Sequence, residues 1–311
     1  NEWRMRDDLA LTFGGRYEDH DAFGGHFSPR AYLVWNTTDN WTLKGGVSRG
    51  YKTPSVNALH PGLNGITNQG QEASVGNPDL DPEISTNTEF GIYYDNLANF
   101  NANLTVFHNK FKDKIQSTSR YNCNYNGEGD EPEQSPPPAD CYNLVGFDDQ
   151  GSVGWDVNVD EAVTQGIELA GKWQFAPAWS IRAHYTYTDS EQRSGADKGA
   201  PLTNTPDHLV TARLTWEASP RINLWLQGEY RSERERFLQR YNRLTAANRR
   251  IQDAAGDLKA YEVFHLGGTF RATDRLSLSA AVYNLLDKDF TKGTTYDDNG
   301  TQAWVSDYIQ T

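Results

Sequence analysis

The sequence lacks any apolar segment long enough to cross a membrane as a helix. Such a helix needs about 20 consecutive, mostly apolar residues, whereas hydrophobic residues make up only 37% of this chain and are spread along it. A helical membrane protein is therefore excluded. Methionine occurs only once, but there are nine Trp and sixteen Tyr residues. Together with abundant Gly, Asn, Thr and Asp, this composition favours many strands and turns.

The sequence also has fewer basic than acidic residues, and it has only two cysteines. The net charge of −13 opposes binding to a phosphate backbone, so no nucleic acid partner is expected. The two cysteines, Cys123 and Cys141, lie in one Pro-rich polar segment without a His at the spacing of zinc ligands. We therefore expect a disulfide rather than a metal site. A disulfide would indicate an oxidising compartment.

Apolar and polar residues alternate with a period of two along most of the chain. In residues 209–217, for example, Val210, Ala212 and Leu214 alternate with Thr211 and Arg213. Such alternation predicts half-buried strands. We expect eleven of them, near 9–17, 27–35, 41–51, 86–95, 100–110, 163–175, 179–187, 209–217, 221–231, 261–271 and 276–284, and the start of a twelfth near Trp304.

The connections between these strands alternate in length. Short turns are expected at 37–40, 96–99, 176–178, 218–220 and 272–274, and long polar segments near 18–26, 52–85, 112–155, 189–205, 232–258 and 286–303. Outer-membrane barrels have tight periplasmic turns and long outer loops. This asymmetry favours a barrel over a soluble β-sandwich.

The tryptophans provide an independent test of the barrel. Trp35, Trp41, Trp173, Trp179 and Trp216 all lie near a short turn and on the apolar side of their strands. Amphipathic rings at one depth form the aromatic girdle of a lipid-facing surface. The opposite, polar side should line the lumen, with Glu89, Asn101, Asn103, Glu168, Arg182, His184, Arg213, Gln227 and Glu229.

The predicted fold class is therefore all-β, an antiparallel transmembrane β-barrel. Residues 1–311 are expected to form one domain, the C-terminal portion of a larger barrel, because an open sheet edge cannot face lipid. Further strands are expected upstream and at the C-terminus. No charged segment followed by an apolar run opens the chain, so we also expect a signal peptide and further sequence before Asn1.

Two motifs follow the third and precede the fourth predicted strand, and another follows the eleventh. They are Ser48-Arg49-Gly50-Tyr51-Lys52-Thr53-Pro54-Ser55, Gly76-Asn77-Pro78-Asp79-Leu80-Asp81-Pro82-Glu83, and Asn284-Leu285-Leu286-Asp287-Lys288-Asp289-Phe290. In this order they resemble the barrel motifs of the TonB-dependent receptor family, although Asp81 stands where the family usually has Lys. Prolines end strands, and Asn77 and Asp79 are suited to side-chain turns. We expect the motifs to be mainly structural.

The resemblance carries expectations about function. The segment Leu59-His60-Pro61-Gly62 and the strand 163–169 look most like ferric enterobactin and other catecholate siderophore receptors. This implies a protein of the Gram-negative outer membrane that imports an iron(III)–siderophore complex. The family's plug domain and TonB-contacting segment are absent from this chain, so TonB would bind through that missing N-terminal region. Another chelate (haem, cobalamin or a different siderophore), a passive porin and an adhesin-like barrel are the alternatives.

Neither an enzyme nor a bound cofactor is expected. Gly46-Val47-Ser48-Arg49-Gly50 fits the nucleophile-elbow pattern, but Tyr51-Lys52-Thr53-Pro54 follows it where a helix is required. The seven histidines are scattered and form no metal-binding pattern.

A ferric catecholate is a large aromatic anion, so its site should combine basic and aromatic side chains. The first candidate segment carries Arg231, Arg234, Arg236, Arg240, Tyr241, Arg243, Arg249 and Arg250. These arginines have an alternative role, which is to pair with Glu233, Glu235 and neighbouring acids or to bind lipopolysaccharide phosphates. The second candidate is Arg120 with Tyr121, and the third is Tyr51 and Lys52 with His60.

Overall fold

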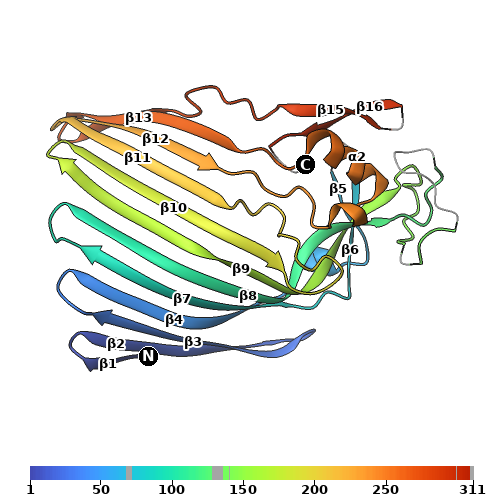
Figure 1. Ribbon diagram of the computed structural model, residues 1–311, viewed down its shortest axis with the longest axis horizontal. Coiled ribbons are helices and arrows are strands. Elements are labelled where there is room, and N and C mark those ends of the chain that lie inside the picture. Colours follow the sequence, from blue (N-terminus) through green and yellow to red (C-terminus); the bar gives the residue numbers. More distant parts are fainter. Residues whose placement is uncertain (68–71, 128–135, 140, 299, 309–311) are drawn as a thin grey trace.

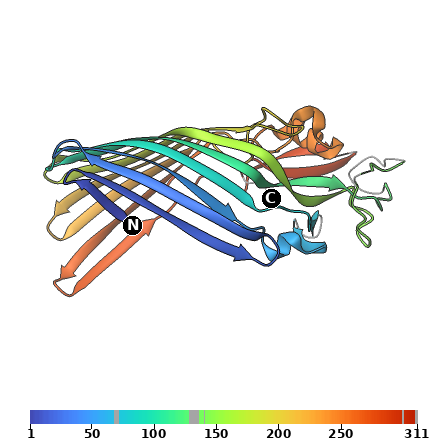
Figure 2. The same cartoon turned by 90° about the horizontal axis from the view of Figure 1, so that it is seen from below.

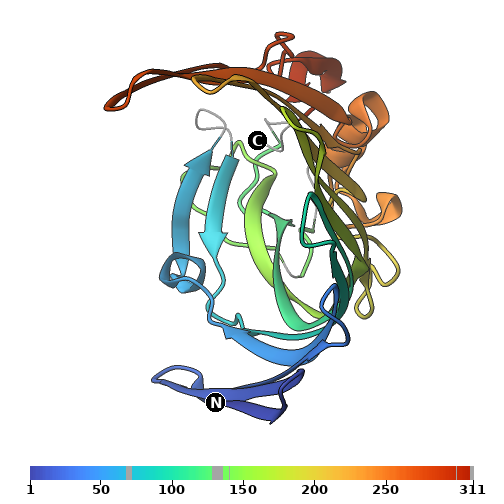
Figure 3. The same ribbon diagram turned by 90° about the vertical axis from the view of Figure 1, so that its left-hand side faces the viewer.

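A long meander of antiparallel strands dominates the computed structural model, which describes residues 1–67, 72–127, 136–139, 141–298 and 300–308. Twelve strands pair in the order of the chain: β1 (Glu2–Arg6), β2 (Leu9–His20), β3 (Gly24–Asn36), β4 (Trp41–Lys52), β7 (Glu83–Asp95), β8 (Phe100–Tyr121), β9 (Ser152–Ala176), β10 (Trp179–Gln192), β11 (His208–Ser219), β12 (Ile222–Arg231), β13 (Tyr261–Thr273) and β14 (Leu276–Val282). The sheet curls into a C-shaped wall (Figure 3).

The remaining elements belong to the connections. Between β4 and β7 lie α1 (Val56–Leu59), β5 (Gly62–Thr67) and β6 (Glu72–Gly76), and β6 also pairs with β9. Between β12 and β13 lie η2 (Tyr241–Arg243) and α2 (Ala246–Ala255). A separate hairpin consists of β15 (Gly293–Asp298) and β16 (Thr301–Ser306). Within the described residues, no helix has the length and apolar character needed to span a membrane.

All eleven predicted strands are present, as β2 to β4 and β7 to β14. The prediction missed β1, a short strand in which Trp3 and Met5 alternate with charged residues. Trp304 does lie in a strand, but the expected twelfth barrel strand is wrong in its pairing, because β16 pairs with β15 rather than with the main sheet. A local turn explains this: Gly300 adopts a positive φ of 89°, and its N–H donates to Asp297 Oδ1 at 2.6 Å.

Short turns and long connections gather at opposite ends of the sheet. The turns at 37–40, 96–99, 177–178, 220–221 and 274–275 lie on the left of Figure 1, whereas α1, α2 and the β15–β16 hairpin lie at the other end (Figures 1 and 2). We call the latter the loop end. The prediction of a long connection at 18–26 is wrong. β2 ends at His20 and β3 begins at Gly24, so a tight turn joins them. Gly24, with φ of 70°, closes it.

The register tests the predicted assignment of residues to the two faces of the sheet. Arg182 pairs with Arg213, and Arg213 with Gln227. Within β9, Glu168 is paired with Thr105 on β8 and with Thr186 on β10. Because directly paired residues point to the same face, all nine predicted lumen residues share the polar face. That this face meets a plug stays a prediction.

The predicted aromatic girdle is confirmed on the apolar face near the short turns. Trp179 stacks on Trp216 with ring centres 5.2 Å apart, and Phe175 connects Trp179 to Trp173. Trp41 contacts Tyr94 at 4.7 Å on the neighbouring strands. Trp35, Trp41, Trp173 and Trp216 are each at least 39% exposed, as expected for rings that face lipid at an interface.

Candidate functional site

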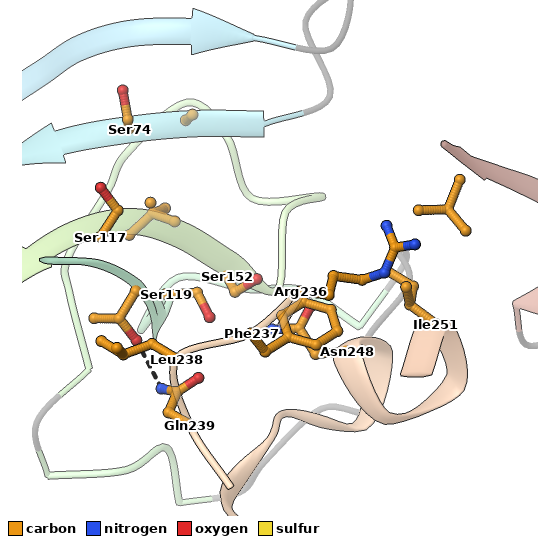
Figure 4. Close-up of a pocket in the computed structure, with 15 residues that line it drawn as sticks. Ser74, Ser117, Ser119, Ser152, Arg236, Phe237, Leu238, Gln239, Asn248 and Ile251 are labelled. Atoms are coloured by element: carbon orange, nitrogen blue, oxygen red, sulfur yellow. Dashed lines mark hydrogen bonds between the residues drawn. The ribbon is translucent and has the colours of Figure 1, made fainter. Parts of the chain in front are cut away.

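Two adjoining pockets lie at the loop end, where β8 and β9 extend beyond the other strands. A strand needs about ten residues to cross a bilayer, whereas β8 has 22 and β9 has 25. The larger pocket, of about 450 Å³, includes Arg120, Trp155 and Arg243 in its lining. The smaller, of about 260 Å³, is shown in Figure 4 between the serines of β6, β8 and β9 and the segment from Arg236 to Gln239.

The segment 237–239 forms the wall between the two pockets. Leu238 is buried against Val159, Ala162 and Leu202, and its carbonyl accepts a hydrogen bond from the Gln192 side chain at 2.9 Å. Gln239 Nε2 donates to Thr118 Oγ1 on β8 at 2.7 Å, the bond drawn in Figure 4. The β12–β13 connection is thus packed onto the extended strands and shapes both pockets.

A guanidinium and an aromatic ring lie side by side in the larger pocket. The Arg120 guanidinium carbon lies 4.6 Å from the Trp155 ring centre, and Tyr142 packs against the same ring at 5.5 Å. Arg243 Nε lies 3.3 Å from Asp197 Oδ1. This wall offers positive charge and flat apolar surface together, which suits an aromatic anion. Tyr121, by contrast, is buried and contacts Tyr125 edge-on.

Arg234 and Arg236 are both buried and hydrogen-bonded to backbone carbonyls. Their exposures are 7% and 3%. Arg234 donates to the Tyr308 carbonyl, and Arg236 Nε donates to the Gly256 carbonyl at 2.9 Å. Burial lowers the pKa of both guanidinium groups. They join the β12–β13 connection to itself and to the chain after β16. Arg236 also lines the smaller pocket, and Arg234 lines a separate pocket with Glu235 and Asp257.

The other arginines of this segment also have partners, which are not Glu233 or Glu235. Arg250 pairs with Asp298 of β15. Arg240 donates to the Lys198 carbonyl, and its own N–H binds Asp197. With Tyr241, Arg240 lines a third pocket of about 370 Å³. Arginines of this segment do pair with acids, as the alternative role predicted. The acids, however, are Asp197 and Asp298 from loops distant in sequence rather than Glu233 and Glu235.

The raised pKa of Glu235 predicts that the stability of the β12–β13 connection depends on pH. Burial, followed by the negative charges of Asp257, Asp207 and Glu233, raises its pKa to about 7. Because the folded-state pKa lies above the unfolded value, the stabilisation is complete below pH 4.5 and is lost as pH rises through about 7. We expect hydrogen-exchange protection of residues 234–258 to be higher at pH 5 than at pH 8, after correction for intrinsic rates.

Glu235→Gln should abolish this pH dependence, and Glu233→Gln, an exposed neighbour, should retain most of it. An unchanged pH dependence in Glu235→Gln would show that another group controls the loop.

The third candidate segment lies apart from these pockets. Tyr51 stacks on His26 with ring centres 3.8 Å apart, and Lys52 forms an ion pair with Glu83 at 3.0 Å. His60 follows α1, where its backbone contacts β6. None of these three predicted residues lines the pockets formed by β8, β9 and the β12–β13 connection.

The first two sequence motifs fasten the β4–β7 connection to β8 and β9. Ser55 caps α1, with its Oγ accepting from the Ala58 N–H at 3.1 Å. The Asn77 side chain donates to the Asp156 carbonyl at 2.9 Å, and its Oδ1 accepts from the Asp79 N–H. Pro54, Leu80 and Pro82 are buried, whereas Pro78 and Asp79 are exposed. Glu83 accepts from the Ile115 N–H at 2.9 Å. These contacts are consistent with the structural role expected of the two motifs.

The third motif forms a turn after β14. Asn284 and Asp287 have φ values of 52° and 51°, which Asn and Asp adopt more readily than most residues. Asn284 Nδ2 donates to the Lys288 carbonyl at 2.8 Å, and its Oδ1 accepts from the Lys288 N–H. One side chain thus closes the turn from both sides.

The predicted disulfide between Cys123 and Cys141 is present. Beside it, the Cys123 N–H donates to the Tyr142 carbonyl and the Tyr142 N–H to the Tyr121 carbonyl, at 2.8 and 2.7 Å. The bond closes a loop of sequence separation 18, for which loop-closure entropy suggests a stabilisation of about 3 kcal/mol.

In a Cys123→Ser/Cys141→Ser variant, we expect hydrogen exchange at the backbone amides of residues 123 and 142 to be up to about 100-fold faster. Protection of the amides in β10 to β12 should be unchanged. Unaltered exchange at both amides would show that the loop is held without the disulfide.

Comparison with known proteins agrees with this architecture. Residues 1–285 match the TonB-dependent receptor-like β-barrel family. The chain belongs to this family. It is 34% identical to the iron-regulated outer membrane virulence protein of Vibrio cholerae over 98% of this chain and 42% of that protein. It is 31% identical to the ferric enterobactin receptor of Pseudomonas aeruginosa over 89% of this chain and 35% of the receptor.

A solved structure of the Pseudomonas receptor, a mutant in complex with enterobactin, superimposes with a TM-score of 0.70 at 26% identity, covering 99% of this chain and 42% of that one. The chain thus spans about two fifths of the length of these relatives. As a TonB-dependent receptor barrel it belongs to the outer membrane of a Gram-negative cell.

Sequence reasoning missed Trp155 and Gln239 as pocket residues. A signal for Trp155 is present, because Val153, Trp155, Val157 and Val159 alternate with polar residues and so continue β9 into the supposed loop. Gln239 has no such signal, since its contact with Thr118 joins residues 121 positions apart. Within the described residues, no group of three or more His, Cys, Asp or Glu side chains is placed to hold a metal ion.

Proposed function

We propose that this barrel belongs to an energy-coupled receptor that imports a ferric siderophore of the catecholate class. The observation that carries the proposal is the Arg120–Trp155 pair in the larger loop-end pocket. An iron(III) tris-catecholate carries negative charge and presents flat catechol rings. A guanidinium next to an indole can neutralise the charge and contact the rings at the same time.

The relatives support the same class of ligand. Several relatives are named as receptors for ferric enterobactin, among them proteins of Pseudomonas aeruginosa at 31% and of Escherichia coli at 27% identity. Transport in such a receptor would need TonB, which would act through a plug domain outside this chain. The barrel would supply the outer binding surface and the polar wall around the plug.

Binding and growth assays test the proposal with the full-length receptor. We expect quenching of Trp fluorescence by ferric enterobactin at submicromolar concentrations, as is typical of specific binding, and much weaker quenching by a ferric hydroxamate or haem. In a strain whose native receptor is deleted, growth on the ferric catecholate should depend on both this receptor and TonB. Equal binding of hydroxamate and catecholate would refute the ligand class, and TonB-independent uptake would refute energy coupling.

A further inference from the structure

The larger loop-end pocket contains an acidic side chain among its cations. Three charged residues are present in its lining: Arg120, Arg243 and Asp197. Arg243 Nε lies 3.3 Å from Asp197 Oδ1, so a carboxylate from the β10–β11 connection neutralises one of the two guanidinium groups. Asp197 therefore opposes the anion that the two arginines attract.

Asp197 is held in place independently of Arg243. Its Oδ1 accepts a hydrogen bond from the Arg240 N–H at 2.9 Å. Its own carbonyl accepts from the Ala200 N–H at 2.9 Å, inside a turn in which Gly195 and Gly199 adopt positive φ values of 74° and 84°. The Asp197 side chain is only 12% exposed. The position of the carboxylate thus does not depend on its contact with the guanidinium.

The Arg243 side chain, by contrast, is loosely held. It is 49% exposed, and its contact with Asp197 is an ion pair without a hydrogen bond. Its Nη groups make no hydrogen bond with any residue in the described part of the chain. The backbone is fixed separately, because the Arg243 N–H donates to the Arg240 carbonyl at 2.8 Å and Leu244 is buried. Exposed ion pairs of this kind are weak, so the guanidinium can turn away while the backbone stays in place.

We propose that Asp197 competes with the bound ligand for Arg243 and thereby speeds the release of the iron complex from the pocket. The inference rests on the proposed function and adds to it the residue that limits affinity. A multiply charged iron(III) catecholate attracts Arg243 more strongly than a single carboxylate does, so the guanidinium turns from Asp197 to the ligand on binding. The fixed carboxylate then faces an anion in the same pocket, repels it, and is in place to take Arg243 back.

The two arginines of the pocket thus have different roles. Arg120 forms no ion pair within the described ranges and lies against Trp155, so its attraction for the ligand is permanent. The attraction of Arg243 can be exchanged for Asp197. A transport protein has to bind its ligand tightly enough to capture it and weakly enough to let it leave. Affinity differences between related complexes arise mostly in the dissociation rate, which is the rate that Asp197 would raise.

Three variants of the full-length receptor test the proposal with ferric enterobactin. Asp197→Asn removes the charge and retains an acceptor for the Arg240 N–H. Asp197→Asn/Arg243→Gln removes both partners. Glu191→Gln is the matched control, because it makes the same change of charge beside the same connection, although Glu191 pairs with Arg193 and does not line the larger pocket. Titration of Trp fluorescence gives the affinity, a chase with unlabelled ligand gives the dissociation rate, and radioactive iron gives the saturated rate of uptake into cells.

We expect Asp197→Asn to bind ferric enterobactin about fivefold more tightly than wild type, through slower dissociation, and its saturated uptake to be severalfold slower. Glu191→Gln should equal wild type in all three measurements. The double variant should lose most of the gain in affinity, because Asp197 acts through Arg243. If Asp197→Asn fails to fold, Asp197→Ser, which keeps a hydroxyl acceptor, takes its place.

Several outcomes would overturn the inference. Weaker binding in Asp197→Asn, with faster hydrogen exchange at the Arg240 amide, would show that Asp197 only joins the two connections. Unchanged affinity, an equal gain in Glu191→Gln, or tighter binding with unchanged uptake would also overturn it. All of these leave the proposed function intact, since wild type still binds the catecholate. Failure of wild type and every variant to bind ferric enterobactin would refute the proposed function and the inference together.

Discussion

Replacing Arg120 by alanine is expected to weaken binding of a ferric catecholate to the full-length receptor by about tenfold or more. The guanidinium lies 4.6 Å from the Trp155 ring centre in the larger loop-end pocket. A desolvated cation–π contact contributes about 2 kcal/mol, and a charge-assisted hydrogen bond about 1.5–3 kcal/mol. Losing either to the ligand corresponds to a change of more than tenfold in Kd. Titration of receptor fluorescence with ferric enterobactin measures the effect.

Three companion variants identify what Arg120 contributes. Arg120→Lys retains the charge but not the planar stacking group, so its affinity should lie between wild type and alanine. Trp155→Ala should also weaken binding. Arg193→Ala is the matched control, because Arg193 is exposed in the same region, pairs with Glu191 at 3.1 Å and does not line the pocket. Wild-type affinity in Arg120→Ala would remove the pocket from the binding site.

Gly76→Ala is expected to detach the β4–β7 connection from its position against β9. A Cβ atom at residue 76 would lie 2.1 Å from the His60 carbonyl oxygen and 2.9 Å from its carbon. Both are backbone atoms, so no side-chain rotation can relieve the clash, and overpacking of this kind costs about 1–3 kcal/mol. The first bond to weaken should be that from the Asn77 N–H to the Ala58 carbonyl, which is 2.6 Å long.

Hydrogen exchange at the Asn77, Leu59 and His60 amides measures this effect, with an expected acceleration of about tenfold to 100-fold. Gly14→Ala serves as the control, because a Cβ there would meet only the Arg30 side chain, at an ordinary 3.5 Å. Equal protection in Gly76→Ala and wild type would mean that α1 shifts without loss of the motif contacts. The second motif would then not depend on its glycine.

The transmembrane part of the fold could be predicted from the sequence because its determinants are local. Alternation with a period of two assigns each side chain to a face, and paired strands preserve that assignment across the sheet. The Trp179–Trp216 stack follows from two alternation patterns and one short turn. Where strands extend past the membrane, the apolar face is no longer required. For this reason β2 and β8 were predicted to end too early, and β3 and β9 to begin too late.

The loop-end pockets and the fate of the arginines were decided only by the tertiary structure. Arg234 and Arg240 belong to one arginine-rich segment, yet Arg234 is buried and donates to the Tyr308 carbonyl, whereas Arg240 is exposed and donates to the Lys198 carbonyl. Trp304 has the pattern of a barrel strand but pairs within its own hairpin. Each outcome depends on contacts between residues far apart in sequence. The sequence alone therefore determined the strands, their faces, the disulfide and the girdle, and the folded loops selected Arg120 and Trp155.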